Sequence, residues 1–103
     1  ALIEAGAAVD ATEEDGFTAL MLSCQDGHDL CARALIEAKA NLEVTVQGGY
    51  TALMVSAQLG HEHCARALIE AGANKKAKTK KGSTALDIAK ANKHKAVCAL
   101  LRG

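Results

Sequence analysis

Three histidines recur at a constant interval, and histidine is a side chain that can bind a metal or move a proton. His28, His61 and His94 are 33 residues apart. A residue that returns with a fixed period belongs first to the repeating structure, so we predict a structural role for all three. The run from His61 to Cys64 reads His-Glu-His-Cys, which are metal-ligand types. On a helix only residues three or four apart share a face, so His61 and His63 point to different sides and no metal site is predicted.

The serines and cysteines are the residues that could act as nucleophiles. Ser23 and Ser56 are one period apart and fall inside short apolar runs, not on a strained turn. No acid, base and nucleophile converge on one loop, and no glycine-rich stretch matches a phosphate-binding loop. We therefore predict that the protein is not an enzyme and has no catalytic residue, cofactor or small-molecule site.

The four cysteines are predicted to be reduced. Cys31 and Cys64 occupy equivalent places in neighbouring repeats. Packed helices lie about 8–10 Å apart, beyond the roughly 7 Å between Cα atoms that a disulfide can bridge. Cys24 aligns with Ala57, so cysteine alternates with a small packing residue. Reduced cysteines in the core favour a cytoplasmic or nuclear location.

A basic stretch is the sharpest local feature of charge. It contains Lys75, Lys76, Lys78, Lys80 and Lys81. The interpretation that we favour most is a charged loop exposed to solvent, and the second is a surface that docks an acidic patch of another protein. Nucleic-acid contact or a nuclear-import signal comes after these. Nucleic acid is the less favoured partner because binding without aromatic stacking rests on phosphates alone and weakens steeply with salt.

The elements that position these residues repeat three times. Each unit opens with Gly-x-Thr-Ala-Leu, at 16–20, 49–53 and 82–86, and closes with Ala-Leu-Ile-Glu-Ala, at 1–5, 34–38 and 67–71. The threonine can cap a first helix, which stops at Gly27, at Gly60 or at Asn92-Lys93. Apolar residues four apart then mark one buried stripe on a second helix, predicted over 28–38, 61–71 and 94–102.

Gly-x-Thr-Ala-Leu-Met, then Gly-His, then Ala-Leu-Ile-Glu-Ala-Gly-Ala closely resembles the ankyrin repeat, whose 33-residue unit opens with Thr-Pro-Leu-His. The resemblance covers essentially the whole chain. It implies an all-α fold, an ankyrin-type α-solenoid of helix-turn-helix repeats with β-turn fingers. Fingers and first helices would form a concave face. Residues 1–103 are then a single ankyrin-repeat domain, with 1–5 as the tail of a truncated repeat and repeats at 6–38, 39–71 and 72–103.

The chain departs from the family pattern in its helix starts and ends. Alanine replaces the family's proline, and Met21, Met54 or Asp87 replaces its histidine. These changes are expected to remove the polar interaction that fixes the first helical turn in the family, which we call the first-turn lock. The periodic histidine is expected, by resemblance, to order the turn between the two helices. Lys39 stands where the other copies have the helix-ending glycine, and at a positive φ it would cost about 1 kcal/mol. Lys90 replaces a small residue, which suits a water-facing terminal repeat.

The resemblance implies a non-catalytic protein–protein interaction scaffold that binds a macromolecular partner through finger tips and the first-helix concave face. Buried positions match between copies, so the candidate partner-binding residues are outward positions read by comparing copies. They are Glu14, Asp15, Phe17, Gln25, Asp26, Gln47, Tyr50, Gln58, Leu59, Lys80, Lys81, Ser83 and Asn92. Phe17 and Tyr50 are aromatic anchor candidates. The alternative is that each ring lies flat on a neighbouring finger.

Two other functions stay open. Residues 6–38 carry a net charge of −6 and residues 72–103 carry +8, so the acidic front of one copy could meet the basic rear of another. The lysine-rich third finger could instead contact nucleic acid. The near-identity of the first two repeats also allows a duplicated spacer with no selected ligand, and the bare front suggests a fragment of a longer protein. No apolar stretch approaches the roughly 20 residues that cross a bilayer, so no membrane partner is expected.

Overall fold

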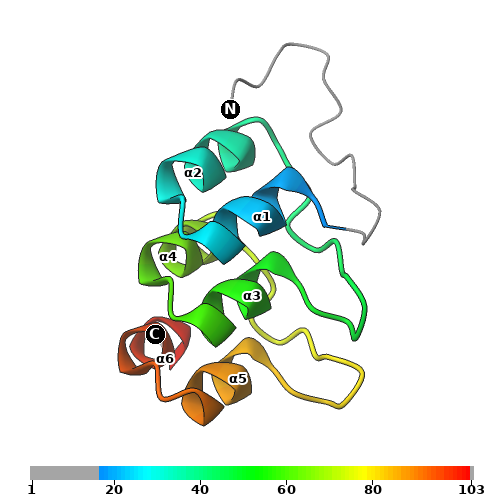
Figure 1. Ribbon diagram of the computed structural model, residues 1–103, viewed down its shortest axis with the longest axis vertical. Coiled ribbons are helices and arrows are strands. Elements are labelled where there is room, and N and C mark those ends of the chain that lie inside the picture. The colour runs from blue at the N-terminus through cyan, green and yellow to red at the C-terminus, as the bar shows by residue number, and fades with distance from the viewer. Residues whose placement is uncertain (1–16, 103) are drawn as a thin grey trace.

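A computed structural model describes residues 17–102 as three helical hairpins (Figure 1). Its helices are α1 (Ala19–Asp26), α2 (Asp29–Glu37), α3 (Ala52–Leu59), α4 (Glu62–Glu70), α5 (Ala85–Ala91) and α6 (Lys95–Arg102). The predicted second helices are confirmed to within one residue at each end. Between residues 17 and 102 the structure contains no extended strand, and an isolated antiparallel bridge joins Val46 to Tyr50. The all-α prediction is therefore confirmed, while the proposed repeat tail at 1–5 lies outside the described residues.

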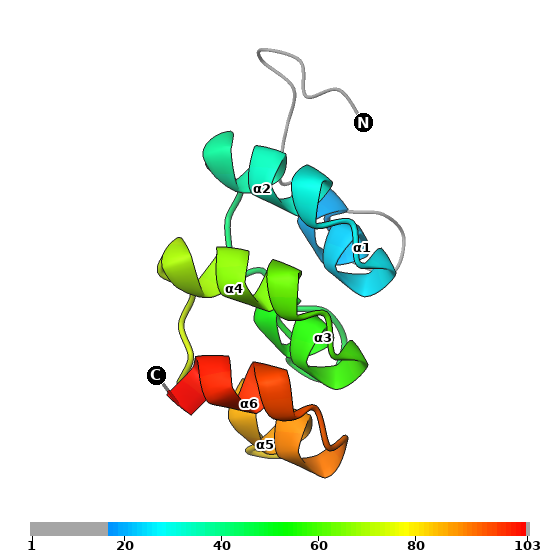
Figure 2. The ribbon, with the colours of Figure 1, turned by 90° about the vertical axis from the view of Figure 1, so that its left-hand side faces the viewer.

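The hairpins stack in register as two layers of helices. α1, α3 and α5 form one layer, α2, α4 and α6 form the other, and each helix packs on its equivalent in the next hairpin (Figures 1 and 2). The loops that join one hairpin to the next lie beyond the first-helix layer, on the side away from the second helices (Figure 1). The first helices therefore stand between the fingers and the second-helix layer.

Threonine begins each first helix, as predicted. The hydroxyl oxygens of Thr18, Thr51 and Thr84 accept backbone N–H groups three residues later, at 3.2, 3.4 and 3.2 Å. Thr18 and Thr51 are buried, so these side chains satisfy helix N–H groups that water does not reach.

The expected loss of the first-turn lock is wrong for the third repeat. A carboxylate oxygen of Asp87 accepts the backbone N–H of Thr84 at 3.1 Å, which completes a reciprocal capping box. In the second repeat the sulfur of Met54, a weak acceptor, lies 3.5 Å from the Thr51 nitrogen. Any acceptor at this helix position can close the lock, so losing the family's histidine does not abolish it.

Residues with positive φ end several helices. Gly27 and Gly60 have φ values of 73° and 76°, and the equivalent Lys93 adopts the same left-handed conformation at 61°. Lys39 has a φ of 69° in the place of glycine, which is the conformation that makes its presence costly. Gly27, Gly60 and Lys93 turn the chain sharply from each first helix into the second, whereas Lys39 follows the second helix α2.

The core is aliphatic and continuous through the stack. Leu20, Leu53, Leu68 and Val97 are almost completely buried, one or more from each hairpin. The helix α3 lies between two others and is buried from Ala52 to Ala57. None of the four cysteines forms a disulfide, as predicted; three are buried and Cys31 is half-buried. None of the helices between residues 17 and 102 is both long and apolar enough to cross a membrane.

Candidate partner-binding surface

Two of the predicted fingers are tight turns closed by backbone hydrogen bonds. In the second finger, the N–H of Val46 donates to the carbonyl of Tyr50 at 2.9 Å. The equivalent bond in the third finger joins Thr79 to Ser83 at 2.8 Å. The buried hydroxyl of Thr79 also accepts the N–H groups of Lys81 and Ser83, at 3.3 and 3.2 Å. The β-turn fingers implied by the resemblance are thus confirmed at these two places.

The fingers are also fastened to each other. The backbone N–H of Lys80 donates to the carbonyl of Gly48 at 2.9 Å. A Cβ atom on Gly49 would lie 3.1 Å from the Lys80 nitrogen, so the two turns approach as closely as backbone allows. Deeper in the loops, a carboxylate oxygen of Glu43 accepts the N–H of Asn74 at 2.9 Å. These bonds hold the finger side chains at a fixed spacing.

The structure exposes most of the candidate partner-binding residues. Exposed members are Gln25, Asp26, Gln47, Gln58, Leu59, Lys80, Lys81 and Asn92, and half-buried members are Phe17, Tyr50 and Ser83. Glu14 and Asp15 lie outside the described residues. Leu59 is 45% exposed, so part of this apolar side chain is accessible to a partner.

The candidates fall into two groups at opposite ends of the first helices. The finger group contains Phe17, Gln47, Tyr50, Lys80, Lys81 and Ser83. The helix-end group contains Gln25, Asp26, Gln58, Leu59 and Asn92. An eight-residue helix is about 12 Å long, and the part of α3 between the groups is buried. A partner that touches both groups must therefore span the first-helix layer.

The two aromatic candidates are partly packing residues. Phe17 and Tyr50 are half-buried and pack against the hydrophobic core. The ring of Tyr50 also lies 3.3 Å from the place where a Cβ atom on Gly48 would be, so it covers its own finger. The alternative that each ring lies flat on a neighbouring finger stays a prediction. Only part of each ring is left for a partner.

The periodic histidines connect neighbouring repeats. The Nε2 atom of His61 lies 3.1 Å from the carbonyl oxygen of Gln25, and that of His94 lies 3.0 Å from the carbonyl oxygen of Gln58. A carbonyl oxygen only accepts, so each Nε2 carries the proton and donates. The structural role is confirmed for His61 and His94, but these bonds reach the preceding repeat, whereas the expectation was a role within the histidine's own turn. They fix the backbone of the helix-end group.

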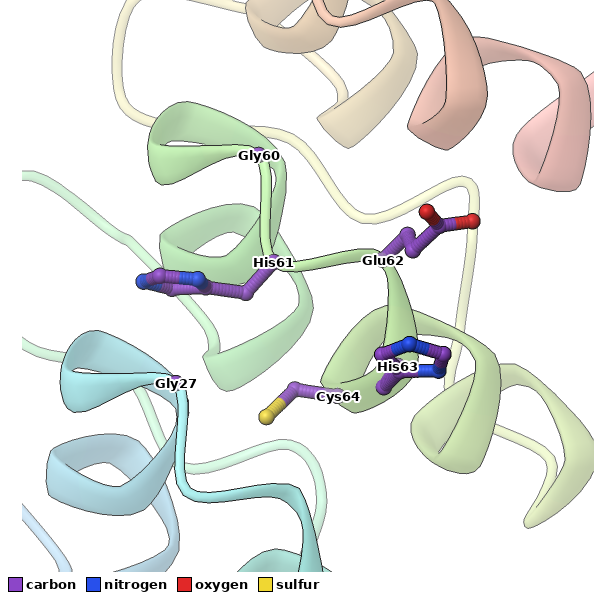
Figure 3. A pocket seen from close by; sticks show the side chains of 6 residues that line it. All are labelled: Gly27, Gly60, His61, Glu62, His63 and Cys64. Atoms are coloured by element: carbon purple, nitrogen blue, oxygen red, sulfur yellow. The ribbon is translucent and has the colours of Figure 1, made fainter.

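The run of metal-ligand residue types from His61 to Cys64 lines a small pocket of about 190 Å³ (Figure 3). The ring of His61 lies over Gly27 and the thiol of Cys64 points toward the first repeat, whereas Glu62 and His63 point away (Figure 3). Over residues 17–102 no group of three potential ligands gathers around one point. Consecutive residues of this run lie on different sides of the helix, so their side chains do not converge on one position where a metal ion could bind.

Buried serine and cysteine side chains, which could act as nucleophiles, form hydrogen bonds with other protein groups. The hydroxyl of Ser56 is fully buried and donates to the carbonyl of Ala52 at 3.2 Å. The thiols of Cys24 and Cys64 meet across the seam between the first and second hairpins. Their hydrogen bond, together with burial, raises the pKa of the Cys24 thiol, so it stays protonated and unreactive. This pair cannot be predicted by aligning the repeats, because the alignment matches Cys64 with Cys31 and Cys24 with Ala57.

Comparison with known families gives a match over the whole chain. A family model described as ankyrin repeats in three copies matches residues 1–79 and 40–103. A search of curated proteins found no match.

Proposed function

Because the chain belongs to the ankyrin-repeat family, we propose that it is a scaffold that binds another protein through the finger group and the helix-end group. Repeats of this family generally mediate protein–protein interaction. The observation that carries the proposal is that residues buried between repeats are kept from one repeat to the next, whereas exposed residues change. Buried Leu20 and Met21 return as Leu53 and Met54 in the second repeat, whereas exposed Asp26 is replaced by Leu59.

The rigidity of these surfaces supports the proposal. The fingers are joined by the Lys80–Gly48 backbone bond, and the helix ends are joined by the His61 and His94 bonds. A surface that is already ordered loses little conformational entropy on association. The side chains that differ between repeats, such as Asp26, Leu59 and Asn92 at one repeat position, can then select the partner. No step of chemistry is required of the protein.

The free thiols support a proposal about location. None of the four cysteines forms a disulfide, and the Cys24 and Cys64 thiols are joined only by a hydrogen bond. Thiols in this state are typical of reducing compartments. We propose that the protein works in the cytoplasm or the nucleus.

Position-resolved photo-crosslinking tests the proposed surface. A photo-reactive amino acid is placed singly at Gln47 or Gln58, and as a control at His63 or Arg66 on the exposed outer side of α4. We expect the same protein to be crosslinked from Gln47 and Gln58 and to be absent from the His63 and Arg66 samples, with mass spectrometry identifying it. Crosslinks only from α4, identical products from all four positions, or none from any position would contradict the proposal.

A further inference from the structure

The end of the stack formed by α5 and α6 carries a basic groove. It has a volume of about 480 Å³ and is lined by Lys90, Lys93, Lys95, Cys98 and Arg102, which we call the end-face groove. The four cationic residues are exposed, and Cys98 is buried beneath them at 6% exposure. The volume lies within the range of roughly 300–1,000 Å³ that is usual for ligand sites.

The same positions form the seams of the first two repeats. Lys90 is equivalent to Cys24 and Ala57, whose side chains are completely buried. Lys93 is equivalent to Gly27 and Gly60, against which the next repeat's histidine ring lies. A Cβ atom on Gly60 would be only 2.6 Å from the ring of His94. The seam therefore requires small, uncharged residues where the end face has lysines.

A further hairpin of the same kind does not fit the end-face groove. The Lys93 side chain begins where the histidine of a following repeat would lie, as the Gly60–His94 contact shows. Packing a hairpin over Lys90 would also bury an ammonium group without a partner, which costs several kcal/mol or more. The occupant of this face must therefore bring negative charge.

The cations of the groove are not neutralised by nearby carboxylates. Within residues 17–102, no carboxylate lies within 4.0 Å of Lys90, Lys93, Lys95 or Arg102. Asp87 is the single acidic residue of 72–103, and its carboxylate already accepts the Thr84 N–H. It lies close enough to Lys90 to interact with it electrostatically, but it leaves the rest of the groove strongly positive.

We propose that the end-face groove binds an acidic polypeptide segment, whose carboxylates pair with the four cations. None of the residues that line the groove belongs to the finger group or to the helix-end group, although Asn92 of the helix-end group lies between Lys90 and Lys93 in the chain. A peptide suits it better than nucleic acid, because residues 72–103 contain no phenylalanine, tyrosine or tryptophan on which bases could stack. Three of the four cations are lysines, which can pair with carboxylates as point charges.

Fluorescence polarisation with acidic peptides tests the inference. The probes are labelled hexaglutamate and a labelled peptide of residues 10–15 of this chain, Asp-Ala-Thr-Glu-Glu-Asp. The test variant Lys90→Ala plus Lys93→Gly takes the residues of the second repeat, Ala57 and Gly60, so it is expected to fold. The control Lys76→Gln plus Lys78→Gln removes the same charge from exposed positions before the third finger.

We expect the test variant to bind hexaglutamate at least fivefold more weakly than the wild type, and the control to stay within twofold. Thermal melting confirms that both variants fold. An equal loss in the two variants would mean nonspecific charge attraction and would overturn the inference, as would no loss in the test variant. A labelled 12-base-pair DNA duplex that binds more tightly than the peptides, and is lost in the same variant, would overturn it in favour of nucleic acid.

Sedimentation at low salt identifies one source of the acidic segment. Self-association of the wild type that the test variant abolishes would support the inference and place the segment in a second copy of the chain. A monomeric wild type that still binds hexaglutamate at the groove would support it with a different protein as the source. Self-association that survives in the test variant, with no peptide binding, would contradict it.

Discussion

The imidazole ring of His94 lies directly against Gly60 of the preceding repeat. A Cβ atom on that glycine would be 2.6 Å from Nδ1 of the ring, and the Nε2 atom of the same ring bonds the carbonyl of Gln58. His61 and Gly27 form the same arrangement at the first seam, with a distance of 3.0 Å. Each hairpin is thus locked to its neighbour by one histidine that needs a glycine opposite it.

Replacing Gly60 by alanine tests this lock, with Gly82→Ala as the matched control. Both glycines have positive φ, 76° and 86°, so both variants carry similar backbone strain of about 1–2 kcal/mol. A Cβ atom at Gly82 meets nothing within 4 Å, whereas one at Gly60 meets His94. We expect Gly60→Ala to lower the free energy of unfolding by about 1–3 kcal/mol more than Gly82→Ala. Equal losses in urea denaturation would show that the ring moves aside freely.

Removing the ring of His61 tests the hydrogen bond across the first seam. His61→Ala is expected to lower the free energy of unfolding by about 1 kcal/mol, because the Gln25 carbonyl loses its donor. His63→Ala is the control, since that side chain is exposed, and should stay within about 0.5 kcal/mol of the wild type. Chemical denaturation of both variants measures the difference. A smaller loss for His61 than for His63 would contradict the assignment.

Lys39→Gly is expected to stabilise the protein. Lys39 has a φ of 69°, and glycine there removes a strain of about 1 kcal/mol. That gain corresponds to a rise in melting temperature of about 4–8 °C for a domain near 100 residues. Ala38, the preceding residue, has a φ of −80°, so Ala38→Gly should lower the melting temperature. Calorimetry that finds Lys39→Gly unchanged or less stable would mean that the strain is absent.

The capping carboxylate of Asp87 predicts a pH-dependent contribution to stability. The N–H of Thr84 and its hydroxyl hold the pKa of Asp87 below its ordinary value. The ionised form therefore stabilises the folded state above the unfolded pKa of about 3.9, and the gain disappears as the pH falls through the lower folded pKa. We expect the melting temperature of the wild type to exceed that of Asp87→Asn at pH 7 and the two to converge near pH 2. A difference that does not change with pH would contradict the capping role.

The sequence predicts the hairpins well because their signals are local. Thr18, Thr51 and Thr84 cap the helices that follow them, and Gly27 and Gly60 end those helices with positive φ. Such residues act through their own backbone and their near neighbours, so their spacing alone locates the helices.

Contacts across the seams are not visible in the sequence pattern. His61 reaches a carbonyl 36 residues earlier, and Cys24 meets Cys64 from the other helix layer. Aligning the repeats pairs Cys64 with Cys31 and therefore hides its real neighbour. The sequence indicates only part of the end-face groove, through Lys90. Lys93 and Lys95 can be assigned to it only from the structure, which shows that the equivalent residues of the second repeat, Gly60 and Glu62, lie at the contact between repeats.

The candidate surface was predicted as one concave face, and the structure divides it into the finger group and the helix-end group. The cause is α3, whose residues from Ala52 to Ala57 are buried between the neighbouring helices. Exposure could be predicted for polar Gln58 and Lys80, since charged and amide side chains rarely bury without partners. It could not be predicted for Tyr50, because only the folded finger shows the ring covering Gly48.

The most direct test of the scaffold proposal is the dissociation constant of the purified protein that crosslinks from Gln58. Calorimetric titration compares the wild type with Gln58→Ala plus Leu59→Ala at the helix end, and with His63→Ala plus Arg66→Ala on α4. The account predicts about tenfold weaker binding for the first pair, equivalent to about 1.4 kcal/mol, and a change within twofold for the second. Binding that depends on the α4 pair and is indifferent to Gln58 and Leu59 would contradict it.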